Sequence, residues 1–182
     1  MFFLFPRSHR LTCYPTPPNP PRQVIPTLLH SLSTPGPVDL QTLQYNVLRA
    51  CLTSRHNTDA LAQCLDRPGA DGVDVCTSTL SRHCTGLTPP TAALAEAAAG
   101  TLAALCARLD AKGRAVAASA VPLIVRCMGA ADLPLRLAAT RAACAVLACT
   151  EGKQAFAECN GTLPLQSMLF VRHDPLLLVA LK

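Results

Sequence analysis

The chain has 182 residues, which is enough for one domain with a substantial hydrophobic core. Half of the residues are hydrophobic, but only 4% are aromatic and there is no Trp, so the core must consist of Leu, Val, Ala and Cys, as in closely packed helices. The net charge of +5 comes from Lys and Arg scattered along the whole length. No block of Lys or Arg occurs, so a solvated exterior is the simpler interpretation, with an acidic partner such as a tubulin tail or nucleic acid as the alternative. The base-reading aromatic residues and clustered Lys and Arg expected of a nucleic-acid-binding module are missing.

The first 22 residues are expected to form a disordered or extended tail outside the folded domain. Five prolines between positions 15 and 21 cannot continue a helix and favour the polyproline conformation. They include the motif Pro17-x-x-Pro20-x-Arg22, which SH3-type domains can bind, although a tail without a ligand is the simpler interpretation. The apolar start, Met1–Phe5, is too short for a secretion signal, and no segment reaches the ~18 uninterrupted apolar residues of a membrane span.

From Gln23 onwards the sequence predicts short helices separated by breaks rich in Pro and Gly. The first unit, residues 23–65, contains predicted helices at 24–32, 38–52 and 58–65. In the long helix of this unit the apolar residues fall at helical spacing and form a stripe along one side. These residues are Leu40, Leu43, Val47, Leu48 and Cys51.

The second unit, residues 66–119, contains predicted helices at 73–84 and 92–109 and a short helix around Val116, after a turn at Lys112-Gly113-Arg114. The third unit, residues 120–160, is expected to turn at Glu151-Gly152-Lys153. Its three predicted helices are 121–128, 135–149 and 154–159. The remaining residues, 161–182, are predicted to begin a partial fourth unit with helices at 163–170 and 174–182.

A hydrophobic-Pro-Leu phrase opens a helix in successive units, at Val121-Pro122-Leu123 and Leu163-Pro164-Leu165. Pro122 and Pro164 are 42 positions apart, and armadillo and HEAT repeats have a period of ~40 to 47 residues. The sequence therefore predicts an all-α fold, a short right-handed armadillo/HEAT-like helical solenoid of three to four repeats over residues 23–182. Because solenoids present extended surfaces to partners, binding is a more natural function for this chain than catalysis.

The ten cysteines and five histidines form no recognisable metal or catalytic motif. No Cys-x-x-Cys pair occurs, and the cluster Cys76–Cys84 lacks a second pair of ligands. The dipeptide His83-Cys84 lacks an orienting third group, and Gly69-x-x-Gly72 is not followed by the Lys-Ser/Thr of a phosphate loop. We therefore predict no catalytic, cofactor-binding or metal-binding residue, no enzymatic activity, and cysteines that serve as small hydrophobic residues in a reducing compartment.

A more specific likeness is carried by EAAAGTLAALCARLDAKGRAVAASAVPLIVRCM, LPLRLAATRAACAVLACTEGKQAF and VDLQTLQYNVLRACLTSRHNTDALAQC. These stretches resemble consecutive repeats of the radial spoke head protein 14 family, armadillo-repeat proteins of ciliary radial spokes. The resemblance covers residues 23–170 and implies a non-enzymatic scaffold of the axoneme that supports ciliary or flagellar motility. It also implies a cytoplasmic, cytoskeletal location and partners among other radial spoke or axonemal proteins in a large hetero-complex. The alternative is a generic cytosolic armadillo adaptor for a signalling or trafficking partner.

Some armadillo proteins grip nuclear-localisation peptides with Asn and Trp side chains on their long helices. The positions expected to correspond are Cys51, Ala104 and Val146 for Asn, and Asn46, Ala99 and Arg141 for Trp. Without a ladder of amides the groove leaves the polar groups of an extended peptide unpaired, so a helical or acidic partner segment is favoured. Five basic residues are candidates for partner contact, with exposed helix faces as the simpler interpretation. They are Arg108, Lys112, Arg114, Arg136 and Arg141.

Overall fold

The computed structural model describes residues 24–53, 58–65 and 71–169 of the chain. Within these ranges the chain forms ten α-helices and no β-strand, which confirms the prediction of an all-α fold. The helices are α1 (Val24–Ser33), α2 (Val38–Thr53), α3 (Thr58–Leu65), α4 (Gly72–His83), α5 (Pro89–Leu105), α6 (Leu109–Ala117), α7 (Ala120–Met128), α8 (Leu133–Val146), α9 (Thr150–Glu158) and α10 (Thr162–Leu169). The predicted tail at 1–22 and the predicted helix at 174–182 lie outside the described residues.

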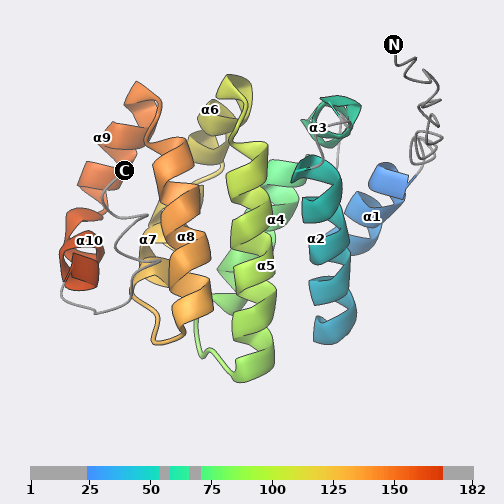
Figure 1. Cartoon of the computed structure of the whole chain (residues 1–182), viewed down its shortest axis with the longest axis horizontal. Coiled ribbons are helices and arrows are strands. Elements are labelled where there is room, and N and C mark those ends of the chain that lie inside the picture. The colour runs from blue at the N-terminus through green and yellow to red at the C-terminus, as the bar shows by residue number, and fades with distance from the viewer. Residues whose placement is uncertain (1–23, 54–57, 66–70, 170–182) are drawn as a thin grey trace, which may run out of the picture.

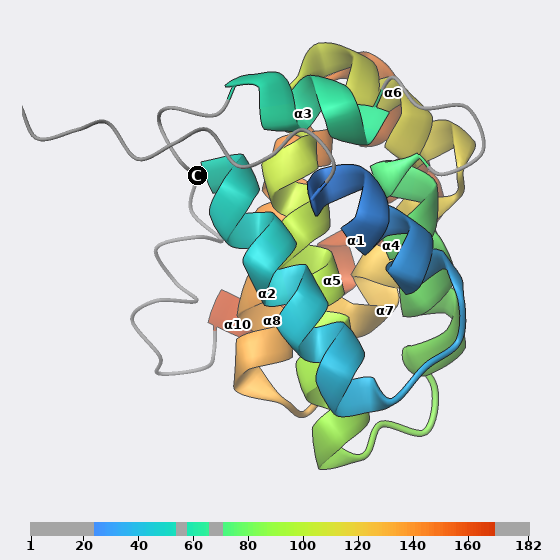
Figure 2. The ribbon, with the colours of Figure 1, turned by 90° about the vertical axis from the view of Figure 1, so that its right-hand side faces the viewer.

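The three longest helices, α2, α5 and α8, lie side by side, with α5 in contact with both of the others (Figure 1). The helices α4 and α7 pack behind this row, α4 against α5 and α7 against α8. The short helices α3, α6 and α9 lie across one end of the row. Figure 2 looks at the opposite edge from α10, where α1 and α2 form the N-terminal end of the stack. Among the described helices, none lies on the other face of the row (Figure 1); this is called the open face.

Side-chain caps fix the beginnings of several helices. Asp71 and Asp132 precede α4 and α8, and their carboxylates accept hydrogen bonds of 2.8 Å from the backbone N–H groups of Val73 and Leu135. Thr88 and Thr91 form a reciprocal capping box at α5. Prolines at the first helical positions need no hydrogen-bond acceptor, so α5 begins at Pro89 and not at 92, and α8 begins at Leu133 and not at 135.

The ends of the long helices and the starts of the short ones differ from the sequence prediction. Helix α5 ends at Leu105 and α8 at Val146, three to four residues earlier than expected. The predicted turns at 112–114 and 151–153 lie inside α6 and α9. Gly152 is therefore not a turn residue. A glycine is required at this position because a Cβ atom would lie 2.2 Å from the carbonyl oxygen of Val146. This glycine therefore allows α9 to pack closely against the end of α8.

The core combines many Leu and Ala side chains with one fully buried tyrosine. Ala97, Ala98 and Ala99 on α5 are all fully buried, which lets neighbouring helices approach closely. Tyr45 on α2 is also fully buried, and its hydroxyl lies 2.7 Å from Oγ1 of Thr79 and 3.1 Å from the carbonyl oxygen of Val75 on α4. Burial raises the pKa of Tyr45 well above its ordinary value. Tyr45 thus links the long-helix row to the helices behind it.

The predicted apolar stripe on α2 is largely exposed, and it is therefore not the face that packs into the core. Leu40, Leu43 and Val47 are 49%, 60% and 41% exposed. The face of α2 that contacts α5 and the helices behind it instead carries Gln41, Tyr45, Leu48 and Leu52, all of them buried. Of the predicted stripe, Leu48 is fully buried, and Leu40, Leu43 and Val47 form a separate, exposed surface.

Candidate protein-binding groove

A groove of about 550 Å³ runs across the open face of the long-helix row. It is formed by side chains from α2, α5 and α8. They are Arg49, Thr53, Glu96, Gly100, Ala103, Ala104, Pro134, Leu137, Ala138 and Arg141. The centre of this groove is made of Gly and Ala, and its charged residues lie on all three helices. A surface of this kind permits a partner helix to approach the backbone closely.

An ion pair joins α2 to α5 along the groove. Nη1 of Arg49 donates to Oε1 of Glu96 at 3.2 Å, and Nη2 donates to Oδ1 of Asn46 at 3.0 Å. The guanidinium passes over Gly100, where a Cβ atom would lie 2.6 Å from Nη1. Because both partners are about one-third exposed, this pair contributes on the order of 0.5 kcal/mol to stability. Its main consequence is that Arg49 and Glu96 largely neutralise one another.

Arg141 differs from Arg49 because it has no charged partner. Its side chain is exposed on α8, and among the described residues it makes no hydrogen bond or ion pair. The neighbouring positions Leu137 and Ala138 are apolar. The groove therefore offers one unpaired cation beside an apolar floor, which suits a segment that carries a carboxylate next to aliphatic or small side chains.

The other four predicted contact residues do not line this groove. Nε and Nη2 of Arg108 each donate to a carboxylate oxygen of Asp110 at 3.0 Å, and this contact lowers the pKa of Asp110. Arg114 donates to Oδ2 of Asp71 at 2.8 Å and to the carbonyl oxygen of Leu65. Both residues, together with Lys112, belong to α6 or to the turn before it.

Arg136 lies on α8 and is half-buried. Its Nε atom is shielded from solvent and has no hydrogen-bond partner among the described residues. Arg136 and Arg141 are five positions apart on the same helix, and only Arg141 reaches the groove. Of the five predicted contact residues, only Arg141 lines the groove, and it is joined there by Arg49, which the sequence did not single out.

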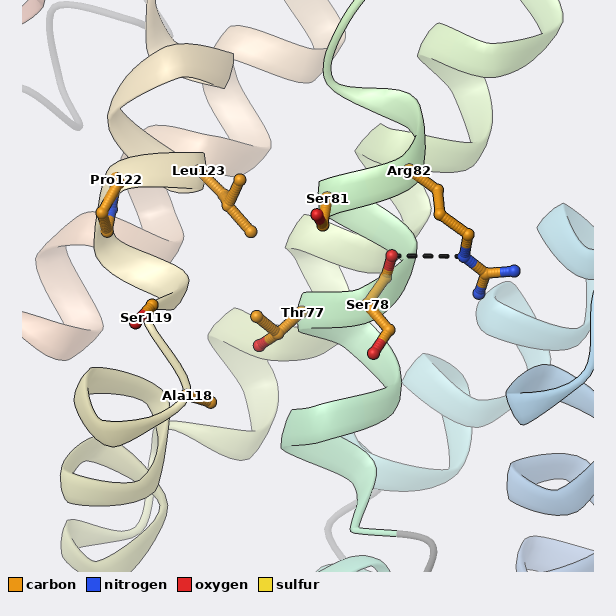
Figure 3. A pocket seen from close by; sticks show the side chains of 8 residues that line it. All are labelled: Thr77, Ser78, Ser81, Arg82, Ala118, Ser119, Pro122 and Leu123. Carbon is orange, nitrogen blue, oxygen red and sulfur yellow. Dashed lines mark hydrogen bonds between the residues drawn. The ribbon is translucent and has the colours of Figure 1, made fainter.

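A second hollow, of about 610 Å³, lies between α4 and α7 (Figure 3). Hydroxyl side chains line much of it, including Thr77, Ser78 and Ser119. Figure 3 shows Arg82 directed away from Pro122 and Leu123, with its Nε donating to the carbonyl oxygen of Ser78 at 3.3 Å. The hollow therefore presents hydroxyls but no charged group directed into it.

The buried cysteines are not activated as nucleophiles. Burial raises the pKa of Cys64, Cys106 and Cys127 to about 12 and that of Cys76 well above its ordinary value. Thiols in this state are poor nucleophiles at neutral pH. His83, beside Cys84, has a lowered pKa through partial burial and the nearby Arg82. In the described ranges no three His, Cys, Asp or Glu side chains gather as a metal-binding group, and no helix is long and apolar enough to cross a membrane.

The sequence offered little signal for the residues that shape the groove. Arg49 and Glu96 are 47 positions apart, and their pairing depends on how α2 packs on α5. The register predicted from the sequence equated Ala104 with Val146, which are 42 positions apart. The residues that terminate α5 and α8 are Cys106 and Leu147, which are 41 positions apart. With this shift Arg141 corresponds to Gly100 and not to Ala99, which is fully buried. A one-residue error therefore concealed the role of Gly100.

Comparison with models of known protein families found no match, and no curated protein matched the sequence. Among solved structures, the chain is similar to the crystal structure of an engineered protein, with a TM-score of 0.55 and 22% sequence identity. The similarity covers 87% of this chain and 69% of the engineered one. At this level of identity the likeness concerns the helical fold alone.

Proposed function

We propose that the chain is a short armadillo-type solenoid that acts as a non-enzymatic scaffold. The support for repeated units is a regular correspondence between helices. The residues that terminate α5 and α8 are 41 positions apart, and so are the left-handed residues Ser119 and Asn160 after α6 and α9. The row of three long helices is the arrangement expected of stacked repeats.

The groove on α2, α5 and α8 is the proposed partner-binding surface, and the unpaired Arg141 beside a floor of small residues is the observation that carries the proposal. A helical partner segment with small or aliphatic side chains fits over Gly100 and Ala103, and a carboxylate on it pairs with Arg141. Such a charge-assisted hydrogen bond contributes about 1.5–3 kcal/mol when partly shielded from water. Nucleic acid and membrane lipid are not proposed as partners.

The proposed cellular setting is the radial spoke of the ciliary axoneme. This part of the proposal rests on the resemblance of residues 23–170 to the radial spoke head protein 14 family. In that setting the groove holds another spoke or axonemal protein, and the chain contributes to assembly and hence to motility. The groove is equally compatible with a cytosolic armadillo adaptor, which is the second candidate because no groove residue is specific to spokes.

A charge reversal in the groove tests the proposed binding surface. Tagged wild-type chain, Arg141→Glu and Lys153→Glu are expressed in ciliated cells, and axonemes are extracted with salt and quantified by mass spectrometry. Lys153 is exposed on α9, outside the groove, so Lys153→Glu is a control with the same change of charge. We expect the wild type and Lys153→Glu to remain with the axoneme and Arg141→Glu to fall at least ten-fold. Equal retention of all three removes the groove from the proposal.

The same experiment separates the two settings. A spoke component stays with the microtubules after salt extraction in proportion to known spoke proteins, whereas a cytosolic adaptor appears in the soluble fraction. Occurrence of the gene in species without motile cilia counts against the spoke proposal and favours the adaptor.

A further inference from the structure

Helix α2 lies at the N-terminal end of the long-helix row (Figure 2). Its exposed stripe forms an apolar surface there. Leu43 is the most exposed of its large residues, at 60%, and Leu40 and Val47 lie one turn before and after it. Ala50 continues the stripe and is also exposed. In the described part of the chain no helix covers these four residues, which we call the end stripe.

The end stripe has the position and character of a helix–helix interface. When α5 is shifted by 54 positions onto α2, every buried residue of α2 coincides with a buried residue at the corresponding position of α5 or its C-cap. When α8 is shifted by 41 positions onto α5, every buried residue of α8 coincides with a buried residue of α5. Leu40, Leu43 and Val47 then correspond to residues that are almost completely buried. These are Leu94, Ala97 and Thr101 on α5, and Leu135, Ala138 and Ala142 on α8.

The contacts of α5 show that the side bearing Leu94, Ala97 and Thr101 packs on the preceding long helix. Oγ1 of Thr101, the counterpart of Val47, donates to the backbone carbonyl of Tyr45 on the preceding long helix at 3.3 Å. The same side of α8 packs on α5. On α2 two of these positions carry larger apolar side chains, Leu43 and Val47, and all three positions are exposed. The end stripe therefore continues the interface that joins the long helices.

The spacing of the end stripe makes it complementary to itself. Positions 40, 43, 47 and 50 are separated by three, four and three residues, which is the seam spacing of two packed helices. An antiparallel copy brings Leu43 of each helix opposite Val47 of the other and Leu40 opposite Ala50. The flanking residues Gln44 and Asn46 are uncharged. The two charged residues of α2, Asp39 and Arg49, come opposite Cys51 and Gln41, so this arrangement brings no like charges together.

We propose that a second copy of the chain packs on the end stripe, with the two α2 helices antiparallel about a twofold axis. The dimer joins two rows of long helices, and the groove residues Ala103 and Arg141 belong to α5 and α8, not to the helix that forms the seam. A seam made by one helix from each copy is smaller than the ~800 Å² per partner of a standard interface, so we expect a dissociation constant on the order of 10 μM. The proposal does not depend on what the groove binds.

Sedimentation equilibrium of the full chain under reducing conditions tests the dimer. The protein concentration ranges from about 1 to about 100 μM, which spans the expected dissociation constant. Leu43→Glu is expected to raise the dissociation constant at least ten-fold. Leu163→Glu, which changes an equally exposed leucine on α10, is the control and should leave it unchanged. Circular dichroism establishes that both variants keep the wild-type helix content. A wild type that is monomeric at every concentration overturns the proposal, since another segment or protein would then cover the stripe. A dimer that Leu43→Glu leaves intact overturns it as well.

Two double variants test the antiparallel geometry. In Leu43→Lys/Val47→Glu an antiparallel pair places Lys opposite Glu, whereas in Leu43→Lys/Val47→Lys it places Lys opposite Lys. We expect the first variant to dimerise at least ten-fold more tightly than the second at low salt. A parallel pair would oppose like charges in both variants, so equal affinities contradict the proposed packing.

Discussion

Replacing Tyr45 by Phe removes one hydroxyl from the centre of the fold and leaves the ring in place. Oγ1 of Thr79 is fully buried and lies 2.7 Å from that hydroxyl, so the change takes away its contact with Tyr45 without admitting solvent. The loss of a buried hydrogen bond of this kind costs about 1–2 kcal/mol. In a protein of this size each kcal/mol shifts the melting temperature by about 2–4 °C, so we expect Tyr45→Phe to melt about 2–8 °C lower.

A double-mutant cycle establishes whether this cost belongs to the contact between α2 and α4. Thr79→Val keeps the shape of the side chain and removes its oxygen, and the double variant carries both changes. Urea unfolding, followed by circular dichroism, should give a coupling free energy of about 0.5–1.5 kcal/mol between the two sites. Strictly additive effects, or a Tyr45→Phe variant as stable as the wild type, would refute the idea that this hydroxyl holds the two helices together.

Three further predictions concern the turns and the cysteines. Ser119 has a left-handed backbone with φ of 57°, so Ser119→Gly should stabilise the chain by about 0.5–1 kcal/mol in thermal melts, and Asn160→Gly by less because Asn tolerates this conformation. Gly152→Ala should destabilise the chain by about 2–3 kcal/mol, because the added Cβ would meet the backbone of Val146. Gly113→Ala, where no atom lies within 4 Å of the added Cβ, should stabilise it by about 0.5–1 kcal/mol. Similar effects at the two glycines would contradict the close packing of α9 on α8. Because burial holds the pKa of Cys64, Cys106 and Cys127 near 12, above the unfolded value, their contribution to stability is complete below about pH 9 and is lost as pH rises towards 12. Urea midpoints should therefore fall between pH 8 and pH 10.5 with reducing agent present, and an unchanged midpoint would refute this.

Local sequence signals were sufficient for the number and order of the helices. Helical spacing and breaks at Pro and Gly located the described helices other than α6 to within a few residues, because those signals act through backbone geometry alone. For α6, which begins at Leu109, the sequence predicted only a short helix around Val116. The errors at Pro89 and Leu133 arose where proline opens a helix and was interpreted as part of a break. At Gly113 and Gly152 the error was that each glycine was interpreted as a turn, whereas both lie within helices.

Tertiary contacts decided the rest. The end stripe on α2 has the same spacing as a core face, and only the stacking order of the helices leaves it exposed. The pairing of Arg49 with Glu96 depends on the absence of a side chain at Gly100, on a different helix. Similarly, the ion pairs of Arg108 and Arg114 could not be assigned until the start of α6 was known. In each case the missing information was which helices are neighbours.

The most direct test of the binding groove is site-specific photocrosslinking in ciliated cells. A benzophenone amino acid replaces Ala103 at the centre of the groove in one chain and Lys153 on α9 in another. We predict that, on irradiation, Ala103 gives a covalent adduct with a discrete protein, that Lys153 does not, and that Arg141→Glu abolishes the adduct at Ala103. Absence of an adduct at Ala103, or one that survives Arg141→Glu undiminished, would contradict the account of the groove as the partner-binding surface.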